Sequence, residues 1–330
     1  MPRPIVHIGY HKTASTWFQK SVYPRVTNYA YVPRERVKRA FLSASALHFD
    51  PDWARAALEL APGRPPILCE EELSGYLHTG GLMGFLSKEM AERIRAVFPG
   101  ARVLIFVRAQ PEMIAACYQQ YLRGGGTYSP RRYLWPEDSL RSAAAQPYKI
   151  PRFSFDHFDY DRLVAHYVAL FGRENVGVHA YEEIQRDARG FLERFAKDEG
   201  LALDLASVSL GKRNASYSPA IAWLARGLNR FTARTVNDKR HWLHVPYWYS
   251  LRKRLIEAVD ATGMLGARAT PDQLLGAPVV AWIRQRYWES NRRLAALVPW
   301  DAAALGYPLD PPAHPVDRPL RPTWLRWTTK

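Results

Sequence analysis

The chain has 330 residues, of which 47% are apolar and 23% are charged, a composition that supports a buried core and excludes a wholly disordered chain. It carries 46 Lys and Arg against 31 Asp and Glu, a net charge of +15. This excess favours an anionic partner, such as a nucleotide, a nucleic acid, a polyanionic glycan or an acidic membrane, although a basic solvated surface would also explain it. The only two cysteines, Cys69 and Cys117, are too few for a disulfide framework or a zinc-ligand set. Because neither a secretory segment nor a membrane-spanning apolar run is found, we expect a cytoplasmic protein.

Short apolar runs alternate with helix-like segments along the first two thirds of the chain. The predicted strands are Ile5–Gly9, 65–69, 102–107 and Asn175–Ala180. The predicted helices are 15–22, 35–46, 50–60, 84–98, a segment after Arg108, 159–171, 187–197 and 273–297. Alternation of this kind predicts a three-layer, P-loop-like α/β fold, with a parallel sheet flanked by helices and with helical additions. We expect one domain over residues 1–330.

Three segments differ in composition from the rest. Residues 123–156 are rich in Gly, Pro, Arg and Tyr, which is typical of a lid or a substrate loop. Residues 211–231 read as a basic loop that leads into a helix, and residues 308–330 read as a Pro-rich tail on the surface.

The stretch 5-IVHIGYHKTASTWFQK-20 carries the strongest signal. A strand that ends in Gly and turns into a helix directs backbone N–H groups and a helix N-terminus at one point. Lys12 adds a full charge, and Thr13, Ser15 and Thr16 add hydroxyl groups, so the loop suits a phosphate or a sulfate group. The ATPase pattern is absent because Ala14 stands where its second Gly would be. The alternative is an ordinary helix cap with a solvated Lys.

The segment HIGYHKTASTWFQ resembles the 5′-phosphosulfate loop of sulfotransferases that use 3′-phosphoadenosine 5′-phosphosulfate (PAPS), whose bacterial pattern is H-x-G-x-x-K-T-G-T-T-x-L-Q. Here Ala14 replaces a Gly, Ser15 a Thr and Phe18 a Leu. The resemblance implies that Lys12 stabilises the leaving 5′-phosphate. It also implies that the loop residues hold the phosphosulfate, namely Lys12, Thr13, Ala14, Ser15, Thr16 and Trp17.

Three further segments extend the resemblance. VLIFVRAQPEMIAACYQQY resembles the family's 3′-phosphate strand and helix, with Arg108 at the strand end. Ala116 stands where the family has a Ser, which removes a charge-assisted hydrogen bond of about 1.5–3 kcal/mol. This implies weaker donor binding, or compensation by Lys212 and Arg213 of a late basic loop. Tyr181 in 176-VGVHAYEEIQRD-187 would lie near the adenine. The alternative for Arg108 is a structural ion pair.

The general base is the least defined part of the resemblance. The stretch 68-LCEEELSG-75 resembles the bacterial segment S-x-E-x-L, whose register places the base at Glu71. Glu70 and Glu72 are the register alternatives, and His11 and His78 are the histidine alternatives. His11 also adjoins Lys12 and would orient it or the acceptor. A solvated acidic loop is the interpretation without a catalytic role.

The resemblance implies transfer of a sulfuryl group from PAPS to an acceptor hydroxyl or amine, with 3′,5′-ADP as product and no metal. Aromatic residues between 128 and 135 and between 242 and 249 suit a carbohydrate or a glycolipid acceptor, or else a phenolic or lipid small molecule. We expect no specific nucleic acid partner. The segment 241–259 would either contact an anionic membrane peripherally or pack its aromatic side chains in the core as an amphipathic helix. An ATP-dependent kinase and a polyanion-binding module are the competing functions, and the oligomeric state is left open.

Overall fold

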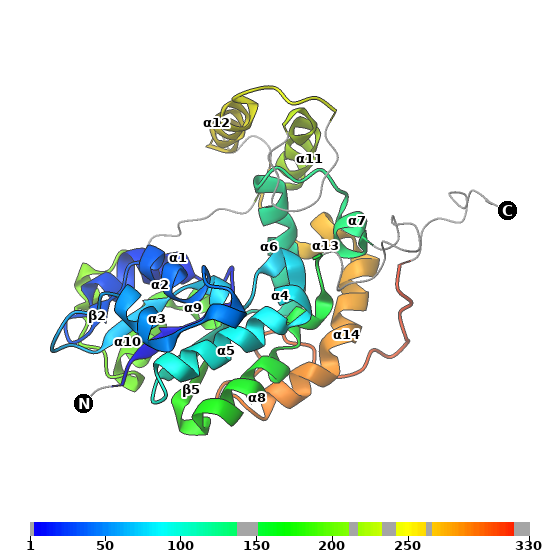
Figure 1. Ribbon diagram of the computed structural model, residues 1–330. Coiled ribbons are helices and arrows are strands. Elements are labelled where there is room, and N and C mark those ends of the chain that lie inside the picture. The colour runs from blue at the N-terminus through cyan, green and yellow to red at the C-terminus, as the bar shows by residue number, and fades with distance from the viewer. Residues whose placement is uncertain (1–2, 137–150, 211–216, 233–241, 262–265, 320–330) are drawn as a thin grey trace.

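The computed structural model describes residues 3–136, 151–210, 217–232, 242–261 and 266–319. A five-stranded sheet lies at its centre in the order β2-β3-β1-β4-β5, with every neighbouring pair parallel (Figure 1). The strands are β1 (Ile5–His7), β2 (Ala30–Tyr31), β3 (Pro66–Cys69), β4 (Arg102–Val107) and β5 (Val176–Ala180). The predicted α/β class and the parallel sheet are therefore confirmed. The two-residue strand β2 was not predicted, because it is too short to carry a hydrophobic pattern.

Helices cover both faces of this sheet. Side chains alternate along a strand, so Val103 and Ile105 pack into one core while Leu104 and Phe106 pack into another. The first core is built with α2 (Arg34–Phe41), α3 (Pro51–Ala57), α5 (Phe85–Val97), α6 (Gln110–Arg123), α8 (Tyr160–Phe171) and α14 (Ala277–Ala295). The second is built with η1 (Phe18–Val22), α9 (Tyr181–Arg186) and α10 (Ala188–Asp198). This arrangement is the predicted three-layer architecture.

Several predicted helices differ from the observed ones at their ends. The helix expected from residue 15 begins as α1 (Ser15–Trp17) and continues as the π-helical turn η1. The helix expected over 273–297 is divided at Gly276, whose φ of 96° separates α13 (Pro271–Leu275) from α14. The predicted loop after α6 contains the short helix α7 (Pro130–Leu134), and its residues 137–150 lie outside the described part.

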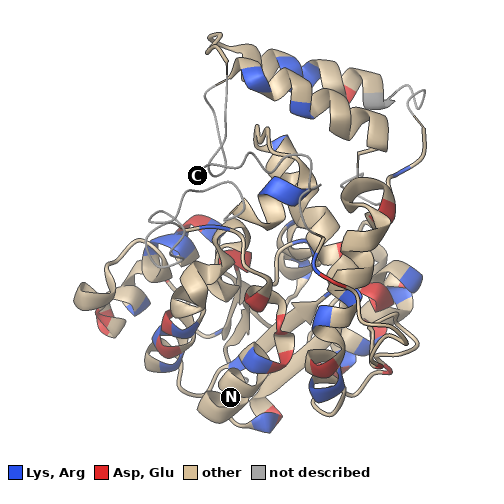
Figure 2. Cartoon of the chain, turned by 90° about the vertical axis from the view of Figure 1, so that its right-hand side faces the viewer, with Lys and Arg blue, Asp and Glu red and all other residues tan. Residues whose placement is uncertain are grey.

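Two helices stand away from the sheet. Figures 1 and 2 show α11 (Pro219–Leu228) and α12 (Trp248–Ala261) side by side, beyond the end of α6. The buried guanidinium of Arg252 ties α12 to the main body, because it donates to Asn229 Oδ1 at 2.6 Å and to the Arg123 carbonyl at 2.9 Å. The Arg123 carbonyl also accepts from the Tyr249 hydroxyl at 3.0 Å, so two residues of α12 bind the end of α6.

The segment 241–259 does not place all its aromatic side chains in the core. Helix α12 begins only at Trp248, and the Trp242 and Tyr247 side chains are 70% and 90% exposed. Core packing is therefore wrong for these two residues. Leu251 and Leu255 are also exposed, close in sequence to Lys253 and Arg254, and the membrane contact stays a prediction. In the described part of the chain, no helix is both long and apolar enough to span a membrane.

Candidate functional site

The site begins where the chain leaves β1. Gly9 has a φ of +105°, and a Cβ atom at this position would lie 3.1 Å from the Cα atom of Glu71. A side chain here would be strained by this φ, and the Glu71 backbone would have to shift by a few tenths of an ångström to make room for it. The glycine allows the chain after β1 to lie directly against the chain after β3.

The loop after Gly9 has an unusual backbone conformation at two residues. Lys12 and Ala14 have φ values of 64° and 70°, both in the left-handed region. The Thr13 hydroxyl donates to the Tyr10 carbonyl at 2.5 Å, so it fixes the turn. No described residue accepts a hydrogen bond from the backbone N–H groups of residues 12 to 16. Five consecutive donors therefore remain available for an anion.

Lys12 lies among other cationic groups. Burial, followed by the nearby guanidinium groups of Arg123 and Arg108, lowers the pKa of the Lys12 ammonium to about 8. No described carboxylate lies within ion-pair distance of it, although Glu71 is near enough to favour its charged form. An anion bound at this loop would supply the counter-charge that Lys12 lacks.

Arg108 and Tyr181 meet at the ends of neighbouring strands. Arg108 follows β4 and Tyr181 follows β5, and the guanidinium carbon lies 4.9 Å from the centroid of the Tyr181 ring. The Arg108 Nε atom is buried and has no hydrogen-bond partner. No described carboxylate forms an ion pair with Arg108, which argues against the structural ion pair considered from the sequence. Ligands of open α/β sheets bind at this edge.

Helix α6 places two small side chains behind the cationic groups. Ala116, which stands where the resemblance expects a Ser, is half-buried. The Cys117 thiol is buried near Lys12 and Arg108, and burial raises its pKa to about 12, so the thiol is neutral at neutral pH. The predicted partners Lys212 and Arg213 lie outside the described residues. Trp17 Nε1 donates to the Ser209 carbonyl at 2.8 Å, which brings the chain just before them to the loop.

The three acidic residues after β3 have different surroundings. Glu70 is fully buried and accepts two hydrogen bonds from Arg34, at 2.6 and 2.8 Å. Glu72 lies 3.7 Å from Lys38, and its side chain is 33% exposed. These contacts make Glu70 a structural residue and leave Glu72 on the surface side. A solvated acidic loop is therefore wrong for Glu70.

Glu71 is the acid that lies beside the loop. Its side chain is only 14% exposed, with Oε1 accepting from Arg34 at 3.0 Å and Oε2 accepting from Gln19 at 3.0 Å. Sequence reasoning missed both partners. Gln19 lies within the stretch 5–20, but its sequence position alone does not indicate a role. No sequence signal links Arg34 to Glu71, because their contact forms only when the chain folds.

The two histidine alternatives are both neutral at neutral pH. Burial, followed by the charges of His157 and Lys12, holds the pKa of His11 well below its usual value, and its Nδ1 atom has no hydrogen-bond partner. Burial also lowers the pKa of His78 to about 3, and His78 Nδ1 is 2.8 Å from the Tyr133 hydroxyl. His11 is thus a neutral imidazole next to Lys12, and its lowered pKa makes it a weaker proton acceptor than an ordinary histidine.

Among the residues that the structure describes, no group of three His, Cys, Asp or Glu side chains could hold a metal ion.

Comparisons with known proteins give fold-level likenesses only. No family model matches the chain, and no curated protein matches it. The crystal structure of a sulfotransferase from Alicyclobacillus acidocaldarius is 16% identical with a TM-score of 0.46, over 65% of this chain and 87% of that one. The sulfotransferase domain from the curacin biosynthetic pathway is 11% identical with a TM-score of 0.38, over 79% and 98%. These values do not decide the function.

The left-handed backbone at Ala14 predicts an unusual response to glycine. A left-handed conformation costs a residue with a Cβ atom roughly 1–2 kcal/mol, and Ala14→Gly removes this cost. The same change gives the unfolded chain more conformational freedom, which destabilises the folded protein and so opposes the gain. We expect Ala14→Gly to leave the free energy of unfolding unchanged, or to raise it by up to about 1 kcal/mol, in urea titrations. Ala116→Gly, the same change inside right-handed α6, should lower it by about 1 kcal/mol. Equal losses in both variants would contradict strain at Ala14.

The lowered pKa of Lys12 predicts pH-dependent anion binding. The ammonium is charged below its pKa of about 8, so affinity for inorganic sulfate should fall about tenfold between pH 7 and pH 9 if only the charged form binds. Sulfate itself keeps one charge state over this range, so the change reports the protein. Calorimetric titrations should show little of this decline in Lys12→Met. A decline of the same size in that variant would remove Lys12 as its cause.

Proposed function

We propose that the protein transfers a sulfuryl group from PAPS to an acceptor hydroxyl or amine. The observation that supports this most is the meeting of two cations without acidic partners, Lys12 and Arg108, with the open backbone donors of residues 12 to 16. Two separate cationic positions at one sheet edge suit a ligand with anionic groups at two ends. PAPS has this character, with a 5′-phosphosulfate and a 3′-phosphate.

Each part of the donor has a proposed partner. The backbone N–H groups of residues 12 to 16 would bind the phosphosulfate, together with the Lys12 ammonium. Arg108 would bind the 3′-phosphate through its planar guanidinium. Tyr181, already in contact with Arg108 at 4.9 Å, would lie against the adenine. Lys212 and Arg213 remain proposed partners of the 3′-phosphate, in place of the hydroxyl that Ala116 lacks.

The proposed reaction is an in-line displacement at sulfur. The acceptor oxygen forms a bond to sulfur while the bond from sulfur to the 5′-phosphate oxygen breaks. Lys12 stabilises the negative charge that gathers on this leaving phosphate, and the N–H groups of the loop hold the group in position. The acceptor proton passes to a base on the opposite side of the transferred group.

Glu71 is the proposed base. Its carboxylate lies near Lys12, and Gln19 and Arg34 fix both oxygens while each oxygen keeps a lone pair. His11 is the second candidate, because its neutral ring has an unpartnered Nδ1 atom. A kinase or a simple polyanion-binding module remains the competing function, and neither explains why a single acid is held beside Lys12.

Replacement of the base should slow the reaction without weakening donor binding. With PAPS in EDTA and a panel of hydroxyl acceptors, wild type should release 3′,5′-ADP, and Glu71→Gln should lower turnover by roughly 100-fold or more. Affinity for 3′,5′-ADP should change little. Glu72→Gln is the matched control, since it removes the same charge from the neighbour that faces Lys38.

Two outcomes would overturn parts of this proposal. Full turnover in Glu71→Gln, under conditions where chemistry limits the rate, together with loss of turnover in His11→Asn, would move the base to His11. Release of product from ATP only in the presence of Mg²⁺, and none from PAPS, would replace the sulfotransferase with a kinase.

A further inference from the structure

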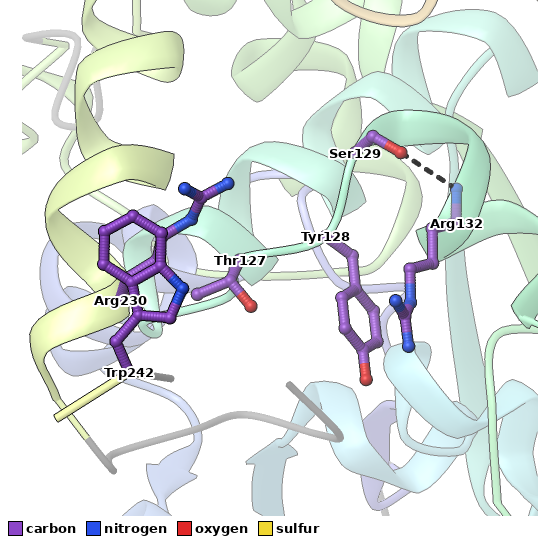
Figure 3. Close-up of a pocket in the computed structure, with 6 residues that line it drawn as sticks. All are labelled: Thr127, Tyr128, Ser129, Arg132, Arg230 and Trp242. Atoms are coloured by element: carbon purple, nitrogen blue, oxygen red, sulfur yellow. Dashed lines mark hydrogen bonds between the residues drawn. The ribbon is translucent and has the colours of Figure 1, made fainter. Parts of the chain in front are cut away.

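A second pocket lies beyond the C-terminal end of α6. It has a volume of about 320 Å³, and two chain segments line it (Figure 3). Figure 3 shows Arg230 and Trp242 on one side and Tyr128 and Arg132 on the other. The lining residues are Thr127, Tyr128, Ser129, Arg132, Arg230 and Trp242. The volume is at the small end of ligand pockets, enough for about one or two sugar rings.

Each side of the pocket carries a guanidinium stacked on an aromatic ring. The Arg132 guanidinium lies 4.0 Å from the centroid of the Tyr128 ring, and that of Arg230 lies 4.6 Å from the Trp242 ring. No described carboxylate forms an ion pair with either Arg. A stacked guanidinium still directs its N–H groups outward in its plane, where a carboxylate or sulfate can accept two of them.

The remaining groups suit a hydroxylated ring. Ser129 Oγ accepts from the Arg132 backbone N–H at 3.4 Å, which leaves the Ser129 hydroxyl proton to donate elsewhere. The Trp242 side chain is 70% exposed, but its ring is contacted by the Arg230 guanidinium at 4.6 Å and lies 5.9 Å from the Phe231 ring. An exposed but anchored ring offers a flat apolar face at a small cost in conformational freedom.

The pocket is connected to the Lys12 loop through α6. The Tyr121 hydroxyl accepts from the backbone N–H groups of Thr127 and Tyr128, both at 3.1 Å. The Tyr121 ring also lies 6.3 Å from that of His78, and the Lys12 ammonium is near enough to His78 to help lower its pKa. Arg123, at the last turn of the same helix, is the charged residue with the largest effect on the pKa of Lys12. The pocket therefore lies at the end of α6 that carries Arg123, and Tyr121 of the same helix contacts both the pocket segment and His78.

We infer that this pocket is the acceptor subsite and that it binds an acidic carbohydrate, a sugar chain with a ring carboxylate. This inference rests on the proposed function, because it assigns the pocket to the acceptor of that reaction. Arg132 and Arg230 bind the carboxylate, and Trp242 packs on the ring. A neighbouring sugar then presents its hydroxyl toward Lys12. Two cations that no described carboxylate neutralises, in so small a pocket, favour an anionic sugar over a neutral one.

The test compares two oligosaccharides that differ in charge. A hyaluronan tetrasaccharide carries carboxylates, and chitotetraose is neutral and of similar length. With 3′,5′-ADP present, calorimetry should show hyaluronan tetrasaccharide binding at least about tenfold more tightly than chitotetraose. The double variant Arg132→Gln/Arg230→Gln should lose about tenfold or more of this affinity.

A matched double variant separates the pocket from overall charge. Lys253→Gln/Arg254→Gln also removes two positive charges, on the exposed surface of α12 and away from the pocket lining. Its affinity for the tetrasaccharide should stay within about twofold of wild type at moderate salt. The single variants Arg132→Gln and Arg230→Gln, with thermal unfolding curves, show whether a loss arises from misfolding.

The outcomes distinguish this inference from the proposed function. Equal binding of the two oligosaccharides, no binding of either, or equal losses in both double variants would overturn the acidic-carbohydrate subsite. Absence of 3′,5′-ADP binding would instead overturn the proposed function. Binding of 3′,5′-ADP without selective binding of the tetrasaccharide would remove the subsite alone.

Discussion

The close approach of Gly9 to the backbone of Glu71 is the contact on which the candidate site depends. It brings the chain leaving β1 against the chain leaving β3, so that the Lys12 loop and the proposed base share one edge of the sheet. Any side chain at Gly9 would push these segments apart. The strand order supplies the rest, because β4 lies on the other side of β1 and delivers Arg108 to the same edge.

The electrostatic balance of this edge is unusual for a resting protein surface. Lys12 and Arg108 have no described acidic partner, while the nearby acids Glu70 and Glu71 are paired with Arg34. The fold thus uses a separate cation to neutralise its acids and leaves positive charge beside the open N–H groups of the loop. Such an arrangement destabilises the free protein slightly and favours a bound anion, which is how a donor site gains selectivity for charge.

The same logic extends along α6 to the second pocket. In this pocket Arg132 stacks on Tyr128 and Arg230 stacks on Trp242. Stacking holds each guanidinium in place without neutralising its positive charge. Helix α6 begins beside Arg108 and ends beside the pocket. It therefore provides one rigid connection between the proposed donor and acceptor positions.

Sequence reasoning found the parts of the site that follow strands directly. The Lys12 loop, Arg108 and Tyr181 each come just after an apolar run, so the parallel arrangement alone places them at one edge. It did not find Arg34, Gln19 or Arg123 as site neighbours, because these contacts form only when distant segments pack together. Strand β2 was too short to detect.

The positive φ at Ala14 was also hidden in the sequence, because Ala gives no signal for that conformation. The sequence also did not indicate the second pocket, because its lining residues come together only when distant segments pack. It joins the residues after α6 to Arg230 and Trp242, about a hundred positions later in the chain. Its aromatic residues were noticed, but their pairing with Arg132 and Arg230 required the fold.

The proposed function depends most on Arg108 recognising the 3′-phosphate of a nucleotide that binds without metal. The most direct measurement is calorimetric titration of 3′,5′-ADP and 5′-AMP in EDTA into wild type and Arg108→Ala, with Arg162→Ala, an exposed Arg of α8, as control. The account predicts that wild type and the control bind 3′,5′-ADP at least about tenfold more tightly than 5′-AMP, and that Arg108→Ala loses this preference. Equal affinity of wild type for the two nucleotides, or binding of either only with Mg²⁺, would contradict it.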